Sequence, residues 1–288
     1  MSRVSALYLT LCGATCMSFV GLLIRLINEA DGFQILFYRS FGMSAIILLV
    51  ISLKRKINPL IIFKSIDKND LLMGAFFSLA FLTYVFSMLN TSIASTLFLL
   101  SMSPIFAGLI GWVWIGEKPK KIVWLSMFIA LIGVFIMIGD GLKFSKTFGN
   151  LLAILSAIFF ALGLVQARKS KKDDVLGGTF LGAVFSCILG FVITLILDNG
   201  VAIAVNDILI SLFMGFFTIG LGIALVTWAT PYLPAAEISL LVLLESILGP
   251  IWVWYFLNEI ITLPEIVGGF TVLCAVILMI YVNKPVES

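Results

Sequence analysis

One carboxylate in this sequence lies where a carboxylate is costly, inside a long apolar run. Glu245 belongs to the run over residues 235–257; at about 1.5 Å per residue it lies roughly 14 Å along a helix that starts near Ala236. A charge near the centre of a membrane is unfavourable unless it faces a cavity or a partner. Gly249 and Trp252 share its helical face. A carboxylate, a glycine that leaves space and an indole on one helical face predict a site for an ammonium group, held by charge and cation–π attraction.

Two other interpretations of Glu245 stay open at this point. The carboxylate could exchange a proton with water and so link the site to a proton gradient. Alternatively, Glu245 is a structural acid that accepts a hydrogen bond from a serine or tyrosine on a neighbouring helix.

Ser103 is the second candidate, and it directly precedes Pro104 in the run over residues 92–116. It would lie about 17 Å into that helix. Because Pro104 has no backbone N–H, a carbonyl one turn earlier loses its partner, which a membrane tolerates where a neighbour or a wet cavity accepts it. A neutral Ser103 opposite an acidic Glu245 predicts an asymmetric, partly negative pocket. The alternative is a kink whose hydroxyl is satisfied locally.

Arg39 lies about 9 Å into the run over residues 33–53, close enough to the membrane surface for its head group to reach water. One interpretation is an ion pair with Glu29 or Asp31. The other is an anchor or gate for the carboxylate of a bound molecule.

Aromatic residues complete the predicted pocket. Tyr84 and Trp228 lie inside apolar runs and are predicted to form walls beside Glu245. An aromatic residue in such a chain is more often a packing residue or part of an interfacial belt, as we expect for Trp124.

The sequence offers no constellation for catalysis or for metal binding. It contains no histidine, and its four cysteines lie inside apolar runs, where they are expected to behave as small buried hydrophobes. We therefore expect no enzyme activity, no metal and no cofactor. The bases lie in short clusters between apolar runs, so no nucleic-acid partner is expected either.

The elements that carry these residues are predicted to lie in lipid. Of the 288 residues, 61% are hydrophobic and 11% are charged, against roughly 45–50% and 25% in soluble domains. Each apolar run is long enough to cross a membrane as a helix of about 20 residues. Ten such runs fall at about 5–27, 33–53, 70–90, 92–116, 121–139, 148–168, 175–197, 207–229, 235–257 and 262–282. The predicted fold class is an all-α integral membrane protein with ten transmembrane helices.

Basic residues predict the orientation of these helices. With the N-terminus in the cytoplasm, 14 of the 18 lysines and arginines fall in cytoplasmic segments. Cytoplasmic loops of membrane proteins are enriched in these residues. Both termini are therefore predicted to be cytoplasmic, and the protein is predicted to be a multi-pass component of a bacterial inner membrane.

The two halves of the chain repeat one another. Pro104 and Glu117 are 13 residues apart, as are Ser246 and Glu259, and an offset of 142 relates the two acids. Because each half holds five predicted helices, an odd number, the halves would cross the membrane in opposite senses. The sequence thus predicts two inverted repeats, residues 1–141 and 148–285, an architecture that builds two gates around one central site.

A small-residue stripe runs along the predicted seventh helix. Its members recur every four residues: Gly178, Gly182, Ser186 and Gly190. Such a stripe predicts close packing against another helix.

The sequence resembles the drug/metabolite transporter superfamily, EamA type, over nearly its whole length. The segments that carry the resemblance are Tyr38-Arg39-Ser40-Phe41, Ala94-Ser95-Thr96, Ser103-Pro104, Gly116-Glu117, Ala236-Glu237, Leu244-Glu245-Ser246 and Asn258-Glu259. Ser246 stands where the family usually has proline, and Asn258 where it usually has glycine. The resemblance implies a ten-helix fold and the transport, often the export, of small metabolites.

Together these observations predict a secondary transporter of amino acids, organic cations or zwitterions that works by alternating access. The predicted site consists of Glu245, Trp252, Ser103, Tyr84, Trp228 and Arg39. The expected partners are a small-molecule substrate, the lipid bilayer and a proton or counter-substrate, in a monomer or a homodimer. No G-x-x-x-x-G-K-[ST] motif occurs, so ATP is not the expected energy source. A passive channel for small solutes is the alternative.

Overall fold

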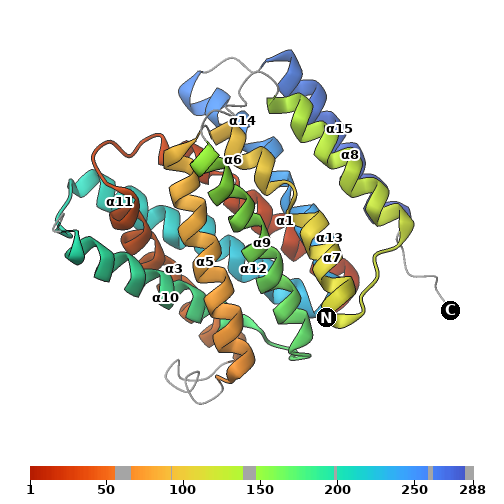
Figure 1. Cartoon of the computed structure of the whole chain (residues 1–288), viewed down its shortest axis with the longest axis horizontal. Helices are drawn as coiled ribbons and strands as arrows, with labels where there is room; N and C mark the ends of the chain where they lie inside the picture. The colour runs from red at the N-terminus through yellow and green to blue at the C-terminus, as the bar shows by residue number, and fades with distance from the viewer. Residues whose placement is uncertain (56–65, 92, 139–146, 198–199, 259–261, 283–288) are drawn as a thin grey trace.

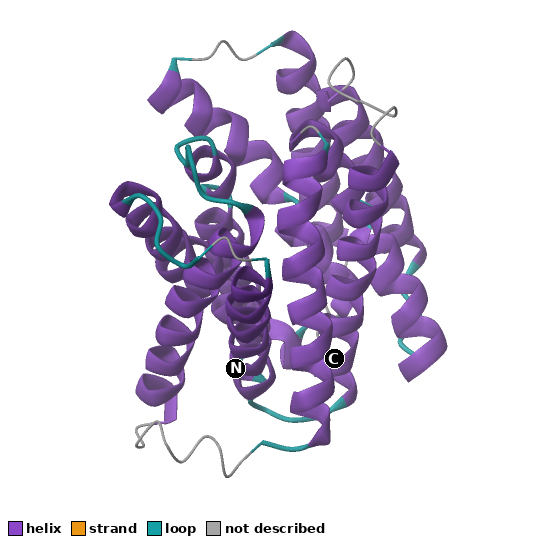
Figure 2. Cartoon of the chain, turned by 60° about the vertical axis from the view of Figure 1, so that its left-hand side comes forward, coloured by secondary structure: helices purple, strands orange, loops and turns teal. Residues whose placement is uncertain are grey.

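The computed structural model describes residues 1–55, 66–91, 93–138, 147–197, 200–258 and 262–282, and within them all regular structure is helical (Figures 1 and 2). The elements are α1 (Arg3–Met17), α2 (Val20–Ile24), α3 (Gly32–Arg55), α5 (Lys68–Asn90), α6 (Ile93–Leu100), α7 (Ser103–Ile115), α8 (Lys121–Ile138), α9 (Thr147–Lys169), α10 (Leu176–Ile196), α11 (Val205–Phe213), the π-helix η3 (Met214–Gly220), α12 (Leu221–Ala229), the 3-10 helix η4 (Thr230–Tyr232), α13 (Ala235–Val242), α14 (Leu244–Leu257) and α15 (Leu263–Val282). The predicted repeat boundaries at residues 141 and 285, and Glu259, the repeat counterpart of Glu117, lie outside the described residues.

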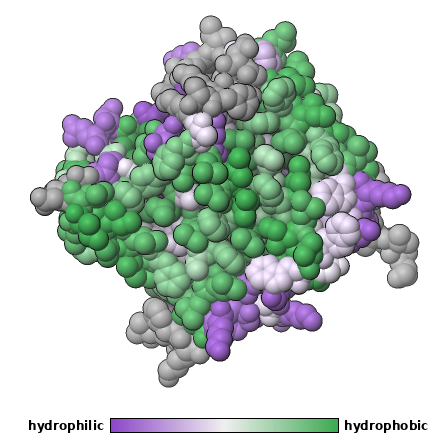
Figure 3. All heavy atoms as spheres, in the orientation of Figure 1, coloured by the Kyte–Doolittle hydropathy of each residue, from purple (hydrophilic) through white to green (hydrophobic). Residues whose placement is uncertain are grey.

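The all-helical prediction is confirmed for the described part of the chain. Eight helical segments in it are long and apolar enough to cross a membrane. Two shorter apolar helices, Lys121–Ile136 and Ile266–Tyr281, coincide with the predicted fifth and tenth crossings. A broad apolar surface covers the middle of the face seen in Figure 3, and hydrophilic side chains gather toward its edges. The chain is therefore a multi-pass membrane protein.

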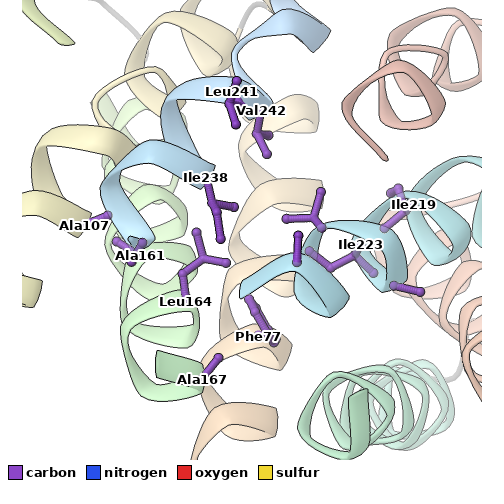
Figure 4. Close-up of a cluster of buried hydrophobic side chains, with 14 of the residues drawn as sticks. Phe77, Ala107, Ala161, Leu164, Ala167, Ile219, Ile223, Ile238, Leu241 and Val242 are labelled. Atoms are coloured by element: carbon purple, nitrogen blue, oxygen red, sulfur yellow. The ribbon is translucent and has the colours of Figure 1, made fainter. Parts of the chain in front are cut away.

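The centre of the bundle is a continuous apolar core. Helices α5, α9, α12 and α13 meet there through Phe77, Leu164, Ile223 and Ile238, all fully buried (Figure 4). In lipid this packing does not come from removing apolar surface from water; it comes from close van der Waals contact. Small residues are consequently needed wherever two helices cross.

The predicted close packing of the small-residue stripe is confirmed. A Cβ atom placed on Gly182 would lie 2.9 Å from the Cβ of Phe77 on α5, and one placed on Gly190 would lie 2.7 Å from the backbone nitrogen of Phe37 on α3. The stripe lets α10 approach both helices at distances that any side chain would prevent.

Two helices in the chain are interrupted at matching places. The α6–α7 pair turns at Ser101 and Met102 and the α13–α14 pair turns at Leu243, so the second interruption forms although Ser246 is not a proline. The two pairs also end alike, because Gly116 and Asn258 both adopt left-handed backbone conformations, with φ of 72° and 54°. Glycine and asparagine are the residues that tolerate this helix-ending conformation, which gives a physical reason for Asn258 at the position where glycine is usual.

Ion pairs join the two halves of the chain at one end of the bundle, the lower end in Figure 1. Arg3 at the start of α1 bonds Glu237 on α13 at 2.6 Å. Arg168 at the end of α9 donates to Glu117 (Nε to Oε1, 2.9 Å) and to the carbonyl oxygen of Pro231 (2.6 Å). Many of the lysines and arginines lie at this end, which we call the basic end.

A third ion-pair cluster at the basic end joins the turn between α9 and α10 to the start of α5. The ammonium group of Lys172 lies 2.9 Å from Asp67 and 2.5 Å from Asp70. Burial by itself would lower the pKa of Lys172, but the hydrogen bonds and charges of both acids raise it above its usual value. Burial would raise the pKa of Asp67, and the backbone N–H of Asp70 together with Lys172 lowers it instead. The charges of Lys172 and Asp67 therefore persist across the physiological pH range.

The packing of α5 on α10 provides a test of the fold. A Cβ atom on Gly74 would lie 2.7 Å from the Cβ of Leu181 and 3.1 Å from the backbone nitrogen of Gly182, whereas one on Gly21 would meet nothing within 4 Å. We expect Gly74→Ala to lower stability by about 1–3 kcal/mol because the helices must separate, and Gly21→Ala to leave it unchanged or slightly raised. Thermal unfolding of both variants in detergent measures the difference. Equal unfolding temperatures would show that the crossing has room for a side chain.

Candidate functional site

The interrupted helices meet at a cavity in the interior of the bundle. Its open volume is about 70 Å³, enough for a few water molecules. Its walls come from α1, α2, α3, α5, α6, α7, α9, η3, α13, α14 and the turns between them: Met17, Val20, Arg39, Ala80, Phe81, Tyr84, Leu97, Leu100, Ser101, Ser103, Ser156, Phe160, Ile219, Ser239, Val242, Leu243, Glu245 and Ser246. Figure 4 shows Ile219 and Val242 from two of these walls.

Glu245 is half-buried, in the first turn of α14. The exposed N–H groups of a helix N-terminus favour a negative charge there, so the interruption at Leu243 both places the carboxylate beside the cavity and stabilises it. No hydrogen bond or ion pair joins Glu245 to another of the described residues.

Arg39 lines the same cavity from α3 and is completely buried. Its backbone lies directly beneath the π-helix, since a Cβ atom on Gly215 would lie 1.9 Å from the carbonyl oxygen of Arg39. One guanidinium nitrogen makes a long contact of 3.4 Å to the carbonyl oxygen of Phe81, whose ring centre lies 5.8 Å away. The other two nitrogens have no hydrogen-bond partner in the described structure.

The environment of Arg39 corrects two of its sequence-based interpretations. The side chain does not reach the membrane surface, because it has no exposed area. It also makes no ion pair with Glu29 or Asp31 in the described structure. Burial beneath η3 is a tertiary constraint that the local sequence around Arg39 does not encode.

Tyr84 and Ser103, two more of the predicted site residues, also line the cavity. Tyr84, on α5, lines the same cavity as Glu245 and Arg39. The hydroxyl of Ser103, at the start of α7, shares a short hydrogen bond with Ser239 on α13. Four of the six predicted site residues therefore lie around one cavity, and two charges of opposite sign are among them.

The two predicted tryptophans lie elsewhere. Trp252 donates from Nε1 to the hydroxyl of Ser18 at 2.7 Å and stacks on Phe19, with ring centres 4.4 Å apart. The face that carries Glu245 and Trp252 thus serves two purposes: its first residue borders the cavity, and the indole packs on the junction of α1 and α2. Trp228 packs against the hydrophobic core and is not among the residues that line the cavity.

Several lining residues were not predicted, although the repeat contains the signal that could have found them. On the two interrupted helices every lining residue except Ser246 has a lining counterpart at an offset of 142: Leu97 with Ser239, Leu100 with Val242, Ser101 with Leu243, and Ser103 with Glu245. The offset relates positions in the two halves, so a residue known to line the cavity in one half indicates its counterpart in the other. Phe81, Ser156 and Phe160 carry no comparable signal, since each is an ordinary residue of an apolar helix.

Metal chemistry finds no support in the described residues. No group of three or more Cys, Asp or Glu side chains there could hold a metal ion.

Comparison with known proteins gives consistent results. The model of the EamA-like transporter family matches residues 4–139 and 147–281, in agreement with the resemblance seen in the sequence. A curated relative from Archaeoglobus fulgidus, named as an uncharacterized transporter, is 23% identical over 215 residues, which cover 74% of this chain and 76% of the relative. One crystal structure aligns over the whole of both chains with a TM-score of 0.80 at 14% identity, a likeness of fold.

The two arginines offer a matched test of which charge is structural. Replacing Arg39 by methionine removes a buried charge with two unpaired nitrogens, so we expect Arg39→Met to unfold at the same or a higher temperature than the wild type. Arg168→Met should unfold at a lower temperature, because Glu117 and the carbonyl of Pro231 lose their donor. Thermal unfolding in detergent compares the two. Destabilisation by Arg39→Met as large as that by Arg168→Met would indicate that Arg39 serves the fold.

Proposed function

The chain belongs to the EamA-like transporter family, and from this premise we propose that it is a secondary transporter of small zwitterionic or cationic metabolites, such as amino acids, that works by alternating access around the cavity of Glu245 and Arg39. The observation that carries the proposal is a carboxylate and a guanidinium on one internal cavity, neither with an ion-pair partner in the described structure. An amino acid supplies the complement of both, an ammonium group for Glu245 and a carboxylate for Arg39.

The physical reason lies in the cost of charge inside a membrane. Glu245 and Arg39 are unfavourable where they stand, and a bound zwitterion relieves both without adding net charge. Charge-assisted hydrogen bonds are strong where water is excluded. The aromatic rings of Phe81, Tyr84 and Phe160 on the same wall suit an apolar portion of the substrate.

The volume of the cavity favours a moving transporter over an open channel. An open volume of about 70 Å³ is smaller than the pockets that hold metabolites, which measure roughly 300–1,000 Å³. The surrounding helices must therefore separate to admit a substrate, and the interruptions at Met102 and Leu243 are natural hinge points. A passive channel would require a continuous path, so it is the weaker alternative.

The proposed architecture is ten membrane crossings in two inverted repeats with both termini in the cytoplasm. Helix packing supports the repeat. When each crossing is replaced by its counterpart in the other half, an observed helix–helix contact becomes another observed contact. The contact of α5 with α9 becomes that of α12 with α1, while α3 with α10 and α8 with α15 exchange into themselves. The paired lining residues and the left-handed ends at Gly116 and Asn258 obey the same relation.

The basic end is the proposed closed gate of this conformation. The four ion pairs described there all join the first half to the second: Arg3 with Glu237, Arg168 with Glu117, and Lys172 with Asp67 and with Asp70. With this end in the cytoplasm, release of the ion pairs would open the cavity toward the cytoplasm. A proton on Glu245 or an exchanged substrate would provide the coupling in a bacterial inner membrane.

Uptake into proteoliposomes tests the role of Glu245. Screening labelled amino acids and their amides identifies a substrate, and for it we expect Glu245→Gln to lower uptake by roughly 10- to 100-fold, since a charge-assisted bond is lost. Glu29→Gln is the matched control, because Glu29 is exposed and away from the cavity. Equal uptake by wild type and Glu245→Gln, with the same dependence on pH, would refute the assignment.

Comparing an amino acid with its amide tests whether Arg39 binds the carboxylate of the substrate. An amino acid and its amide share the ammonium group and differ in the carboxylate. Arg39→Met should therefore reduce competition by the amino acid at least about tenfold while leaving competition by the amide nearly unchanged. A parallel loss for both compounds would show that Arg39 does not bind a carboxylate.

A further inference from the structure

A second hollow lies at the basic end, and the Arg168–Glu117 ion pair forms part of its lining. It measures about 530 Å³ and is formed by the end of α7, the end of α9 and the turn that follows α9. The residues that matter for its chemistry are Trp114, Arg168, Lys169, Lys171, Lys172 and Asp173. We call it the basic hollow.

The four bases of the basic hollow fall into two classes. Arg168 and Lys172 are held by acids, Glu117 for the first and Asp67 and Asp70 for the second. Lys169 and Lys171 make no ion pair with a described residue, and both are exposed. Asp173 also lines the hollow, so the four bases stand beside four acids, and the positive groups without an acid partner are Lys169 and Lys171.

The two available lysines are placed in distinctive ways. Lys169 lies over the ring of Trp114, with its ammonium nitrogen 4.3 Å from the ring centre. Lys171 adopts a left-handed backbone conformation with φ of 52°, which residues other than glycine and asparagine rarely adopt. Such a conformation persists only where the surroundings impose it, and it is concentrated at binding sites and turns.

The hollow lies at the level where lipid head groups are expected. The helical segments Ser95–Ile115 and Thr147–Lys169 qualify as membrane crossings, and both end at the hollow. Trp114 packs edge-on against Phe76 of α5, in keeping with tryptophan at a membrane interface. Val113, one residue before Trp114 on α7, exposes 85% of its surface, which offers apolar contact to an acyl chain.

We propose that the basic hollow binds the phosphate of an anionic phospholipid from the leaflet at the basic end. Lys169 and Lys171 supply the positive charges, Trp114 supports the glycerol region, and the exposed apolar surface of α7 at Val113 contacts the acyl chains. Basic pockets at this depth between membrane helices are suited to anionic head groups. A free phosphate would satisfy the lysines but would gain nothing from the adjoining apolar surface, so the structure favours the lipid. A bound lipid bridges the end of α7 and the turn after α9, and so stabilises the basic end in its closed arrangement.

Thermal unfolding of the full chain in neutral detergent tests this proposal with defined probes. Dioctanoyl phosphatidylglycerol should raise the unfolding temperature in a saturable manner, whereas dioctanoyl phosphatidylcholine and inorganic phosphate at the same concentrations should not. The double variant Lys169→Gln/Lys171→Gln should need about 10- to 30-fold more phosphatidylglycerol for the same shift. Lys118→Gln/Lys120→Gln is the matched control: it removes two charges from the same end outside the hollow and should respond like the wild type.

The double variant Lys169→Arg/Lys171→Arg keeps both charges and should respond like the wild type. It therefore shows whether a weaker response of the glutamine variant comes from lost charge rather than from misfolding. An equal shift with phosphatidylcholine, an unchanged response of the glutamine double variant, or loss of the response in the arginine variant would overturn the proposal. An equal shift with inorganic phosphate would identify a free-anion site and overturn the lipid assignment. Because the measurement concerns binding alone, its outcome is independent of whether the central cavity transports a zwitterion.

Discussion

A charge inside a membrane must find a partner, water or a cavity, and this constraint organises the molecule. Where the chain can pair its charges it does so at the basic end, through Arg168 with Glu117 and Lys172 with Asp67 and Asp70. In the interior two charges lack such partners, Arg39 on α3 and Glu245 on α14, and both border the same cavity. Burying these two groups without partners costs free energy. Binding of a complementary ligand would recover part of that cost.

The helices around the cavity are held by contact rather than by exclusion of water. Gly13 meets Gly222 between α1 and α12, and Gly74 meets Gly178 and Gly182 between α5 and α10, so backbones approach closely on both sides of the central site. Such smooth crossings give strong packing in lipid. Few side chains project at these crossings, so they would also permit the small helix movements that the proposed transport cycle requires.

The interruptions in the two helices create helix starts beside the polar residues of the cavity. An unbroken α13–α14 helix would place Glu245 in mid-helix, without the N–H groups that a helix start offers to a carboxylate. The interruption at Leu243 creates that start, and the matching one at Met102 places Ser103 and its bond to Ser239 opposite it. The same local device thus produces an acid in one half and a neutral hydroxyl in the other, which makes the cavity electrically asymmetric.

The sequence by itself determined the helical class, because 61% hydrophobic residues in long runs leave no other structure able to satisfy its backbone in lipid. It also singled out Glu245, Ser103, Tyr84 and Arg39, since polar groups deep in apolar runs are costly wherever they point. Only the tertiary structure decided where they point. It buried Arg39 beneath η3 instead of letting it reach the membrane surface, turned Trp252 toward Ser18, and placed Trp228 against the core. Helical periodicity assigns a residue to a face of its own helix, but which neighbour covers that face depends on crossings between segments far apart in the chain, and these are set by packing.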